Sequence, residues 1–172
     1  MSSRQASTDS SSSVSLTDLI CDRFSTVKTL WIDHEHEAFS EWVALRQQIL
    51  RDPLGLKYSE QDLADERQQR HLVGWIDEAM VGGLIVNDQE QDPGVFKIRQ
   101  VAVSEAFQSR GIGRILMVEA MVWIQNQGIQ KIVLHSREPV ISFYEKLGFV
   151  AEGEVFHEVG IPHRRMVIQL EN

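Results

Sequence analysis

Residues 108–114, Gln-Ser-Arg-Gly-Ile-Gly-Arg, contain two glycines one residue apart, with an arginine before the first and another after the second. They follow the apolar run 95–103 and precede the apolar stretch 115–124, so they mark a passage from a strand to a helix. The start of a helix exposes unpaired N–H groups and carries partial positive charge. Glycines there let a bulky anion reach the backbone, and Arg110 and Arg114 add charge. The segment indicates an anion-binding site, although a tight strand-to-helix connection explains the glycines equally well.

Two familiar phosphate-binding motifs are excluded by spacing. A dinucleotide-binding fingerprint needs a third glycine three residues after the second, and that position is Leu116. A P-loop needs Gly-Lys-Ser/Thr, whereas Gly113 is followed by Arg114 and Ile115. A ligand at this segment must therefore be a phosphate carrier of another kind.

The preceding strand contains a break in its pattern. By the period of two, Phe96 and Ile98 share one face of the strand, while Val101 and Val103 share the other. A β-bulge around residues 99–100 would produce this slip, bend the strand and leave backbone groups unpaired. An ordinary strand that is covered on both faces remains an alternative.

The rest of the chain predicts an α/β (α+β) domain with one mixed sheet of about seven strands and about four helices. The predicted strands are residues 26–33, 70–77, 78–88, 95–103, 131–136, 150–156 and 164–170, with a closing turn at 160–163. The predicted helices are residues 37–52, a short helix from 59 that Ser59 and Asp62 cap, a helix ending near 126, and 138–149. One central β-α-β unit places two parallel neighbours in the sheet.

Composition limits the function classes. The net charge is −8 without a long basic run, which argues against nucleic acid as a partner. No apolar stretch is long enough to span a membrane. The single cysteine, Cys21, fits a reducing compartment, so we expect a cytoplasmic protein. The Ser-rich residues 1–20 cannot bury surface and are expected to form a disordered tail before the domain of residues 25–172.

Gln108, Gly111 and Gly113 resemble the Q/R-x-x-G-x-G/A signature of the Gcn5-related N-acetyltransferases, after the fourth strand as in that family. Residues 143–149, Phe-Tyr-Glu-Lys-Leu-Gly-Phe, resemble a second family segment. Residues 45–56, 98–103, 134–149 and 160–163 are similar to a subgroup of small, uncharacterised bacterial acetyltransferases.

The resemblance implies a sheet that splays between strands four and five to admit acetyl-coenzyme A. Its pantetheine arm would bond to the backbone of Val101, Ala102 and Val103, and its pyrophosphate would lie on the loop beyond. The loop residues concerned are Gln108, Ser109, Arg110, Gly111, Ile112, Gly113 and Arg114. The activity implied is direct attack of a small-molecule amine on the thioester. Two alternatives stay open: an acyl-coenzyme A-binding regulatory module without turnover, and a protein or peptide acetyltransferase.

The reaction needs an acid for the leaving thiolate and a base for the protonated amine. Tyr144 matches the family's tyrosine and is the predicted acid, although its place on an apolar helix stripe also fits a core residue. Glu158 ranks first as the base, ahead of His157, His135 and Glu66, each of which also fits a plain surface group.

Three further features leave the acceptor undefined. His34 and His36 lie in an acidic stretch, but no further ligand pair completes a metal site, so we predict no metal. Arg46 and Arg51 fit either a substrate anion or ion pairs with neighbouring acids. The closing strands leave a sheet edge that suits a homodimer.

Overall fold

The computed structural model describes residues 27–88 and 92–170, so the predicted tail at 1–20 lies outside the described residues. One seven-stranded sheet has the order β1-β2-β3-β4-β5-β7-β6. The strands are β1 (Lys28–Ile32), β2 (Arg70–Ile76), β3 (Ala79–Asn87), β4 (Val95–Val103), β5 (Lys131–Arg137), β6 (Val150–Glu158) and β7 (Ile161–Gln169). Only β4 and β5 pair in parallel within the described residues, and the mixed α/β sheet predicted from the sequence is confirmed.

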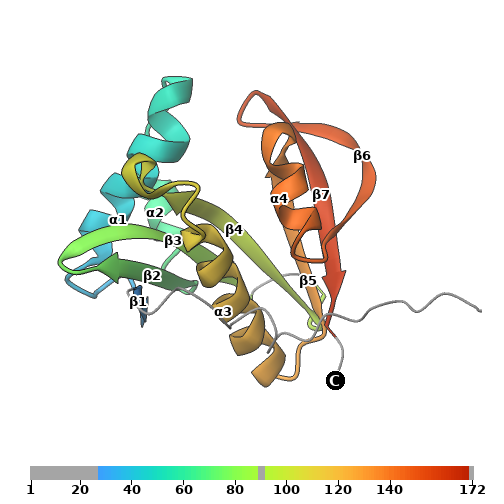
Figure 1. The fold of residues 1–172 in the computed structure, drawn as a ribbon. Coiled ribbons are helices and arrows are strands. Elements are labelled where there is room, and N and C mark those ends of the chain that lie inside the picture. The colour runs from blue at the N-terminus through green and yellow to red at the C-terminus, as the bar shows by residue number, and fades with distance from the viewer. Residues whose placement is uncertain (1–26, 89–91, 171–172) are drawn as a thin grey trace, which may run out of the picture.

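Helices cover both faces of the sheet (Figure 1). The α-helices are α1 (Phe39–Arg46), α2 (Glu60–Ala64), α3 (Ile112–Asn126) and α4 (Ile141–Glu145). The apolar stripe of α3, with Leu116 and Ile124, packs with Ile98 and Tyr144 in the main core. On the opposite face α1 packs through Trp42 in a second, smaller core.

The region after α1 differs from the single helix expected over residues 37–52. Residues before Phe39 form turns, and α1 gives way to a π-helical turn (Gln47–Arg51) and a 3₁₀ turn (Asp52–Leu54). Pro53 cannot supply a backbone N–H, so a regular helix cannot continue through it. The predicted cap of α2 is confirmed: Ser59 and Asp62 form a reciprocal capping box.

The closing hairpin also differs from the expectation. Its turn is Val159–Gly160, with φ of 48° and 79°, and not the segment 160–163. Positive φ at both central residues suits a two-residue hairpin turn. Both strands are therefore longer than predicted, and Glu158 is the last residue of β6 and not a turn residue.

Candidate active site

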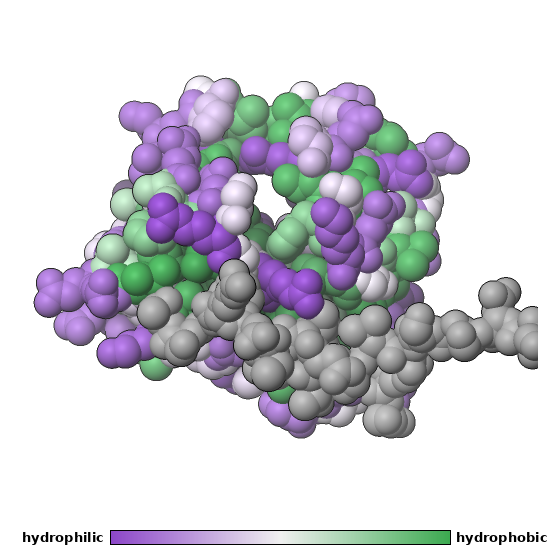
Figure 2. Space-filling model, viewed as in Figure 1, coloured by the Kyte–Doolittle hydropathy of each residue, from purple (hydrophilic) through white to green (hydrophobic). Residues whose placement is uncertain are grey.

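The site begins where β4 and β5 separate. The two strands pair only from Val95–Lys97 against Lys131–Val133, at their N-terminal ends. Beyond that point β4 stays on β3 as far as Val103, while β5 stays on β7 as far as Arg137. The splay predicted between the fourth and fifth strands is thus present, and a cleft of about 850 Å³ lies in it. Figure 2 shows the surface hollowed between the two halves of the molecule.

The predicted bulge lies on β4 at Gln100, which has a φ of 53°. Ala102 pairs with Gly83 and Arg99 with Ile85, so β4 carries one more residue than β3 between these pairs. The extra residue absorbs the slip seen in the sequence. As a result Phe96 and Ile98 before the bulge, and Val101 and Val103 after it, all contact the α3-side core.

Backbone groups after the bulge face the cleft. The N–H of Ser104 donates to the carbonyl of Val81 on β3 (2.9 Å). Because alternate residues of a strand direct their backbone groups to opposite sides, Ala102 also faces β3, whereas Val101 and Val103 face the open side. The amide of Gln108 donates to the carbonyl of Val103 (3.0 Å) and ties the following loop to the end of β4.

The loop ends in a helix start that suits an anion. Gly111 caps α3 with a φ of 83°, and Ser109 has a φ of 60°. Positive φ is strained for most side chains, which explains a glycine at 111. A Cβ on Gly113 would lie 3.4 Å from the Phe143 ring, at ordinary contact distance, so Gly113 packs closely against that ring.

Eleven of the twelve predicted site residues line the cleft, and Arg110 is the exception. Those that line it are Val101, Ala102, Val103, Gln108, Ser109, Gly111, Ile112, Gly113, Arg114, Tyr144 and Glu158. The guanidinium of Arg110 instead lies 5.3 Å from the centre of the Phe107 ring.

Tyr144 lines the cleft and also packs in the core, and its role as the acid stays a prediction. Its ring contacts Phe143 and Phe149 edge to face, and the residue is buried. Burial raises the pKa of the Tyr144 phenol above its usual 10, while the charge of Arg137 opposes the shift. The phenol is therefore a protonated hydrogen-bond donor at any working pH, although its pKa lies further from that of a thiol than the sequence suggested.

Glu158 on β6 and His135 on β5 form a pair across β7, which lies between these two strands. Glu158 Oε2 lies 3.0 Å from His135 Nδ1, and the His135 ring packs on Phe156 with centroids 4.7 Å apart. The hydrogen bond from His135 lowers the pKa of Glu158 from 4.5 to about 2. Because a carboxylate only accepts, Nδ1 carries the hydrogen and leaves Nε2 with a free lone pair. The sequence separated these residues by 23 positions and gave no sign of their contact.

Glu66, another predicted base candidate, is held in a buried ion pair. Arg46 donates to both of its carboxylate oxygens, at 2.9 and 3.0 Å, and both residues are buried. Arg46 thus takes the ion-pair option of the two that the sequence left open. His157 is exposed and is not among the residues that line the cleft.

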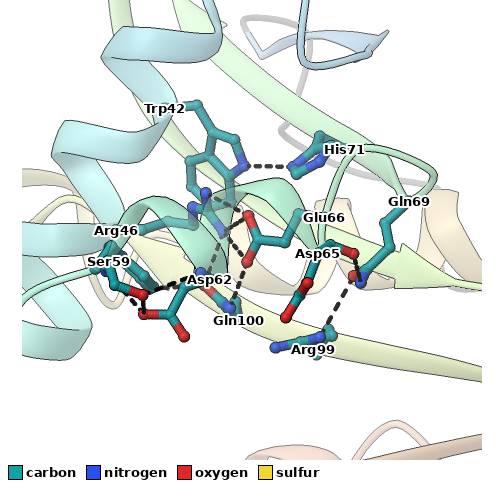
Figure 3. Close-up of polar contacts among 11 residues, drawn as sticks. Trp42, Arg46, Ser59, Asp62, Asp65, Glu66, Gln69, His71, Arg99 and Gln100 are labelled. Atoms are coloured by element: carbon teal, nitrogen blue, oxygen red, sulfur yellow. Dashed lines mark hydrogen bonds and ion pairs between the residues drawn. The ribbon is translucent and has the colours of Figure 1, made fainter.

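The Arg46–Glu66 pair reaches the bulge through Gln100 (Figure 3). Gln100 accepts from Arg46 (2.7 Å) and from the Tyr58 hydroxyl (2.6 Å), and its amide donates to Glu66 (2.8 Å). Sequence reasoning missed Gln100 and Tyr58 because nothing in their spacing links them. The only available signal was the break in β4 alternation at residues 99–100.

No group of three His, Cys, Asp or Glu side chains suited to a metal ion occurs in residues 27–88 and 92–170. His36 Nδ1 accepts from the Ala38 N–H (3.1 Å), and His34 lies near Glu35. Neither histidine lines the cleft. Within the part of the chain that the structure describes, no helix could cross a membrane.

Comparison with known proteins gives one consistent result. A family model described as Acetyltransferase (GNAT) family matches residues 28–149. The protein ElaA of Escherichia coli K12 is 32% identical over 106 residues, which cover 58% of this chain and 68% of ElaA.

Two solved structures share the fold. A putative N-acetyltransferase from Lactobacillus plantarum superposes with a TM-score of 0.75 at 22% identity, covering 85% of this chain and 99% of that one. A GNAT family acetyltransferase from Elizabethkingia anophelis, solved with acetyl-CoA bound, gives 0.64 at 17% identity over 86% and 100%.

Proposed function

Because the chain belongs to the acetyltransferase (GNAT) family, we propose that it transfers the acetyl group of acetyl-CoA to the amine of a small molecule. The observation that carries the proposal is the cleft between the separated strands β4 and β5. Both the backbone groups of β4 after the bulge and the start of α3 line this cleft. The acetyl-CoA bound to the Elizabethkingia anophelis protein, which has the same fold, supports this choice of co-substrate.

The co-substrate fits the cleft in two parts. The pantetheine arm bonds as an added strand to the open-side groups of Val101 and Val103, and Ala102 keeps the strand on β3. The diphosphate lies on the N–H groups from Ser109 to Arg114, where the helix start stabilises negative charge. Gln108 fixes the loop through Val103, so its contribution is to position these groups.

The pair His135–Glu158 acts as the base. Glu158 is ionised and strongly paired, so it is a poor proton acceptor itself, but it holds Nδ1–H and presents Nε2. Neutral Nε2 takes a proton from the ammonium and frees the lone pair of the nitrogen. The role predicted for Glu158 alone is thereby shared between two side chains.

Acetyl transfer forms a C–N bond and breaks the C–S bond of the thioester. The amine nitrogen bonds to the carbonyl carbon, and a cleft-facing N–H of β4 stabilises the charge on the oxygen. The C–S bond then breaks with its electron pair on sulfur, which takes the proton of the Tyr144 hydroxyl. The nitrogen loses two protons: one leaves through His135 to solvent, and the other restores the phenol.

A matched pair of variants at Gly111 tests co-substrate binding. Asn and Asp have the same shape and both tolerate a positive φ, so Gly111→Asn and Gly111→Asp should fold alike. Only Asp places a negative charge against the diphosphate, and at a few ångströms this costs enough to weaken binding by about tenfold or more. Calorimetric titration with acetyl-CoA measures the difference, and thermal unfolding of both variants serves as the control.

The outcomes separate the proposal from its alternatives. If the two Gly111 variants bind acetyl-CoA with equal affinity, the diphosphate does not bind at this loop. If acetyl-CoA binds but no added amine causes release of the CoA thiol, the regulatory module is favoured. If only peptides cause that release, a protein acetyltransferase is favoured.

A further inference from the structure

The cleft is positively charged although the protein is acidic. Its lining residues include six cationic side chains: Arg51, Lys97, Arg99, Arg114, Arg137 and Lys146. Glu158 is the only acid among the lining residues within the described chain, whereas the whole protein has a net charge of −8. The positive charge is therefore concentrated at the site and invites an anion.

Four of the six cations lie away from the helix start that suits the diphosphate. Phe96 and Ile98 contact the α3-side core, so the alternating residues Lys97 and Arg99 lie on the opposite face of β4. Arg99 reaches Gln69 after α2 (3.5 Å).

Of the other two cations, Arg51 belongs to the π-helical turn after α1, and Arg137, the last residue of β5, contacts that turn with its side chain. Arg137 donates to the carbonyl of Leu50 in the π-helical turn (2.9 Å), and the Arg51 guanidinium lies 4.7 Å from the centre of the Tyr58 ring. Arg114, by contrast, belongs to the first turn of α3. Arg51, Lys97, Arg99 and Arg137 form what we call the cationic wall.

No residue of the cationic wall forms an ion pair within the described residues, although Asp62 interacts electrostatically with Arg51 and Arg99, and Glu158 with Lys97. Within residues 27–88 and 92–170, the ion pairs are His34–Glu35, Arg46–Glu66, His135–Glu158 and Arg165–Glu152, and none involves the four wall residues. The nearby Arg46 shows the contrast, because Glu66 neutralises it in the interior. The direct partners of the arginines in the wall are a carbonyl, an amide and a ring, and none of these carries a negative charge.

On the basis of the proposed acetyl transfer, we propose that the acceptor is an amine that also carries an anionic group, either a carboxylate or a phosphate. The guanidinium forks of Arg51, Arg99 and Arg137 bind that group, because their planar donors match both anions. The amine then faces His135, which lines the same cleft. A polyamine or a simple neutral amine would leave the wall unpaired.

A set of near-isosteric amines tests the proposal. Propylamine, β-alanine, O-phosphoethanolamine and 1,3-diaminopropane differ mainly in the group opposite the amine: neutral, carboxylate, phosphate or cationic. A wider panel of α-amino acids and amino-sugar phosphates, with the unphosphorylated sugars as controls, extends the test to larger acceptors. Thiol release from acetyl-CoA gives kcat/KM, and we expect an anionic acceptor to exceed its neutral analogue at least tenfold. The carboxylate and phosphate arms decide between the two anions.

Variants link the preference to the wall. Arg99→Gln and Arg51→Gln should raise KM for the anionic acceptor about tenfold and leave KM for acetyl-CoA unchanged, as expected for the loss of one charge-assisted contact. Arg99→Glu should shift the preference towards 1,3-diaminopropane. Arg165→Gln, which removes only a pair with Glu152 outside the cleft, is the matched control and should change neither KM.

The outcomes are distinguishable from a failure of the proposed function. Preferred turnover of neutral or cationic amines would overturn the anionic acceptor and leave acetyl transfer intact. An anionic preference that survives Arg51→Gln and Arg99→Gln would also overturn the role of the wall. Absence of turnover with every amine would instead overturn the acetyl transfer itself, together with the acceptor class that rests on it.

Discussion

At the scale of single residues, the proposed chemistry depends on how His135 is held. Glu158 lies at the end of β6 and His135 on β5, and β7 lies between these strands in the sheet. The hydrogen bond fixes one ring nitrogen as donor and leaves the other as acceptor. Glu158 is therefore a positioning residue, and His135 is the group that contacts the amine.

Replacement of His135 should therefore cost more activity than replacement of Glu158. We expect His135→Gln to lower kcat by about two to four orders of magnitude, because the glutamine amide cannot take the proton that Nε2 accepts. Glu158→Gln should lower kcat by about tenfold or more, because an amide no longer enforces the tautomer. Steady-state kinetics with saturating acetyl-CoA measures both.

The neighbouring His157→Gln is the control and should keep wild-type kcat, since His157 is exposed and does not line the cleft. Because the folded pKa of Glu158 is about 2, below its ordinary 4.5, the pair with His135 is fully formed above pH 4.5 and is lost only as pH falls towards 2. The assays at neutral pH thus compare ionised Glu158 with a neutral amide. Wild-type kcat in His135→Gln would move the base elsewhere.

At the scale of elements, the buried network supports the bulge that opens β4. Arg46 from α1, Glu66 after α2 and Gln100 on β4 bond to one another, so three separate segments meet at the point where the strand bends. Gln100 adopts a positive φ, which is strained for a residue with a side chain. Three hydrogen bonds to its side chain stabilise this conformation.

Breaking the pair should separate stability from function. Arg46→Met leaves the Glu66 carboxylate buried without its partner, and we expect a loss of about 3–5 kcal/mol in the free energy of unfolding. The double variant Arg46→Met/Glu66→Leu removes both charges and should recover much of that loss. In the double variant Gln100 lacks two of its partners, so the affinity of this variant for acetyl-CoA should stay below that of the wild type.

Urea unfolding and calorimetric titration of the single and double variants measure the two effects. A double variant that binds acetyl-CoA as tightly as the wild type would show that the bulge persists without the network. A single variant as stable as the wild type would contradict the stated cost of the unpaired carboxylate.

The sequence predicted the helices and strands better than the tertiary contacts between them. Alternation in β4 revealed both the strand and its bulge, because a one-residue slip leaves a trace in a period of two. The two glycines at 111 and 113 revealed the strand-to-helix loop. The Arg46–Glu66 and His135–Glu158 contacts join residues 20 and 23 positions apart, and no local pattern encodes such distances. The π-helical turn after α1 was missed because its composition continues that of the helix.

At the scale of the whole molecule, stability should depend on a buried histidine that does not line the cleft. His71 on β2 is fully buried, and its Nδ1 accepts from Trp42 Nε1 (3.1 Å). Burial, with the charge of Arg46 as a second cause and Arg99 and His34 nearby, lowers its pKa from 6.5 to about 4. Folding therefore favours neutral His71.

The pH dependence follows from the sign of this shift. The folded pKa lies below the unfolded one, so the contribution is complete above pH 6.5 and is lost as pH falls to about 4. The loss amounts to about 3 kcal/mol in the free energy of unfolding. His71→Gln keeps an acceptor for Trp42 but does not titrate, so its stability should fall less over this range. Urea unfolding at pH 7 and pH 4 compares the two proteins, and equal losses would exclude His71 as the source.

The expected homodimer stays a prediction. The edge strands of the sheet are β1 and β6, and β6 exposes Val150 and Val155 around an irregular pairing with β7 between Glu152 and Phe156. An open edge allows a second copy to pair, but the irregularity also opposes it.

The short parallel contact between β4 and β5 has a kinetic consequence. Lys97 and Arg99 on β4 and Arg51 after α1 lie on one side of the gap between β4 and β5, and His135 and Arg137 on β5 lie on the other. An acceptor must therefore contact both halves of the molecule at once. Within the described residues, strand pairing between the two halves is confined to Val95–Lys97 and Lys131–Val133, and the Arg137 side chain adds one contact by donating to the Leu50 carbonyl. A thioester arm between the two halves would restrict the angle between them further. Co-substrate first and acceptor second is thus the order of addition to expect, decided by the point at which two strands part.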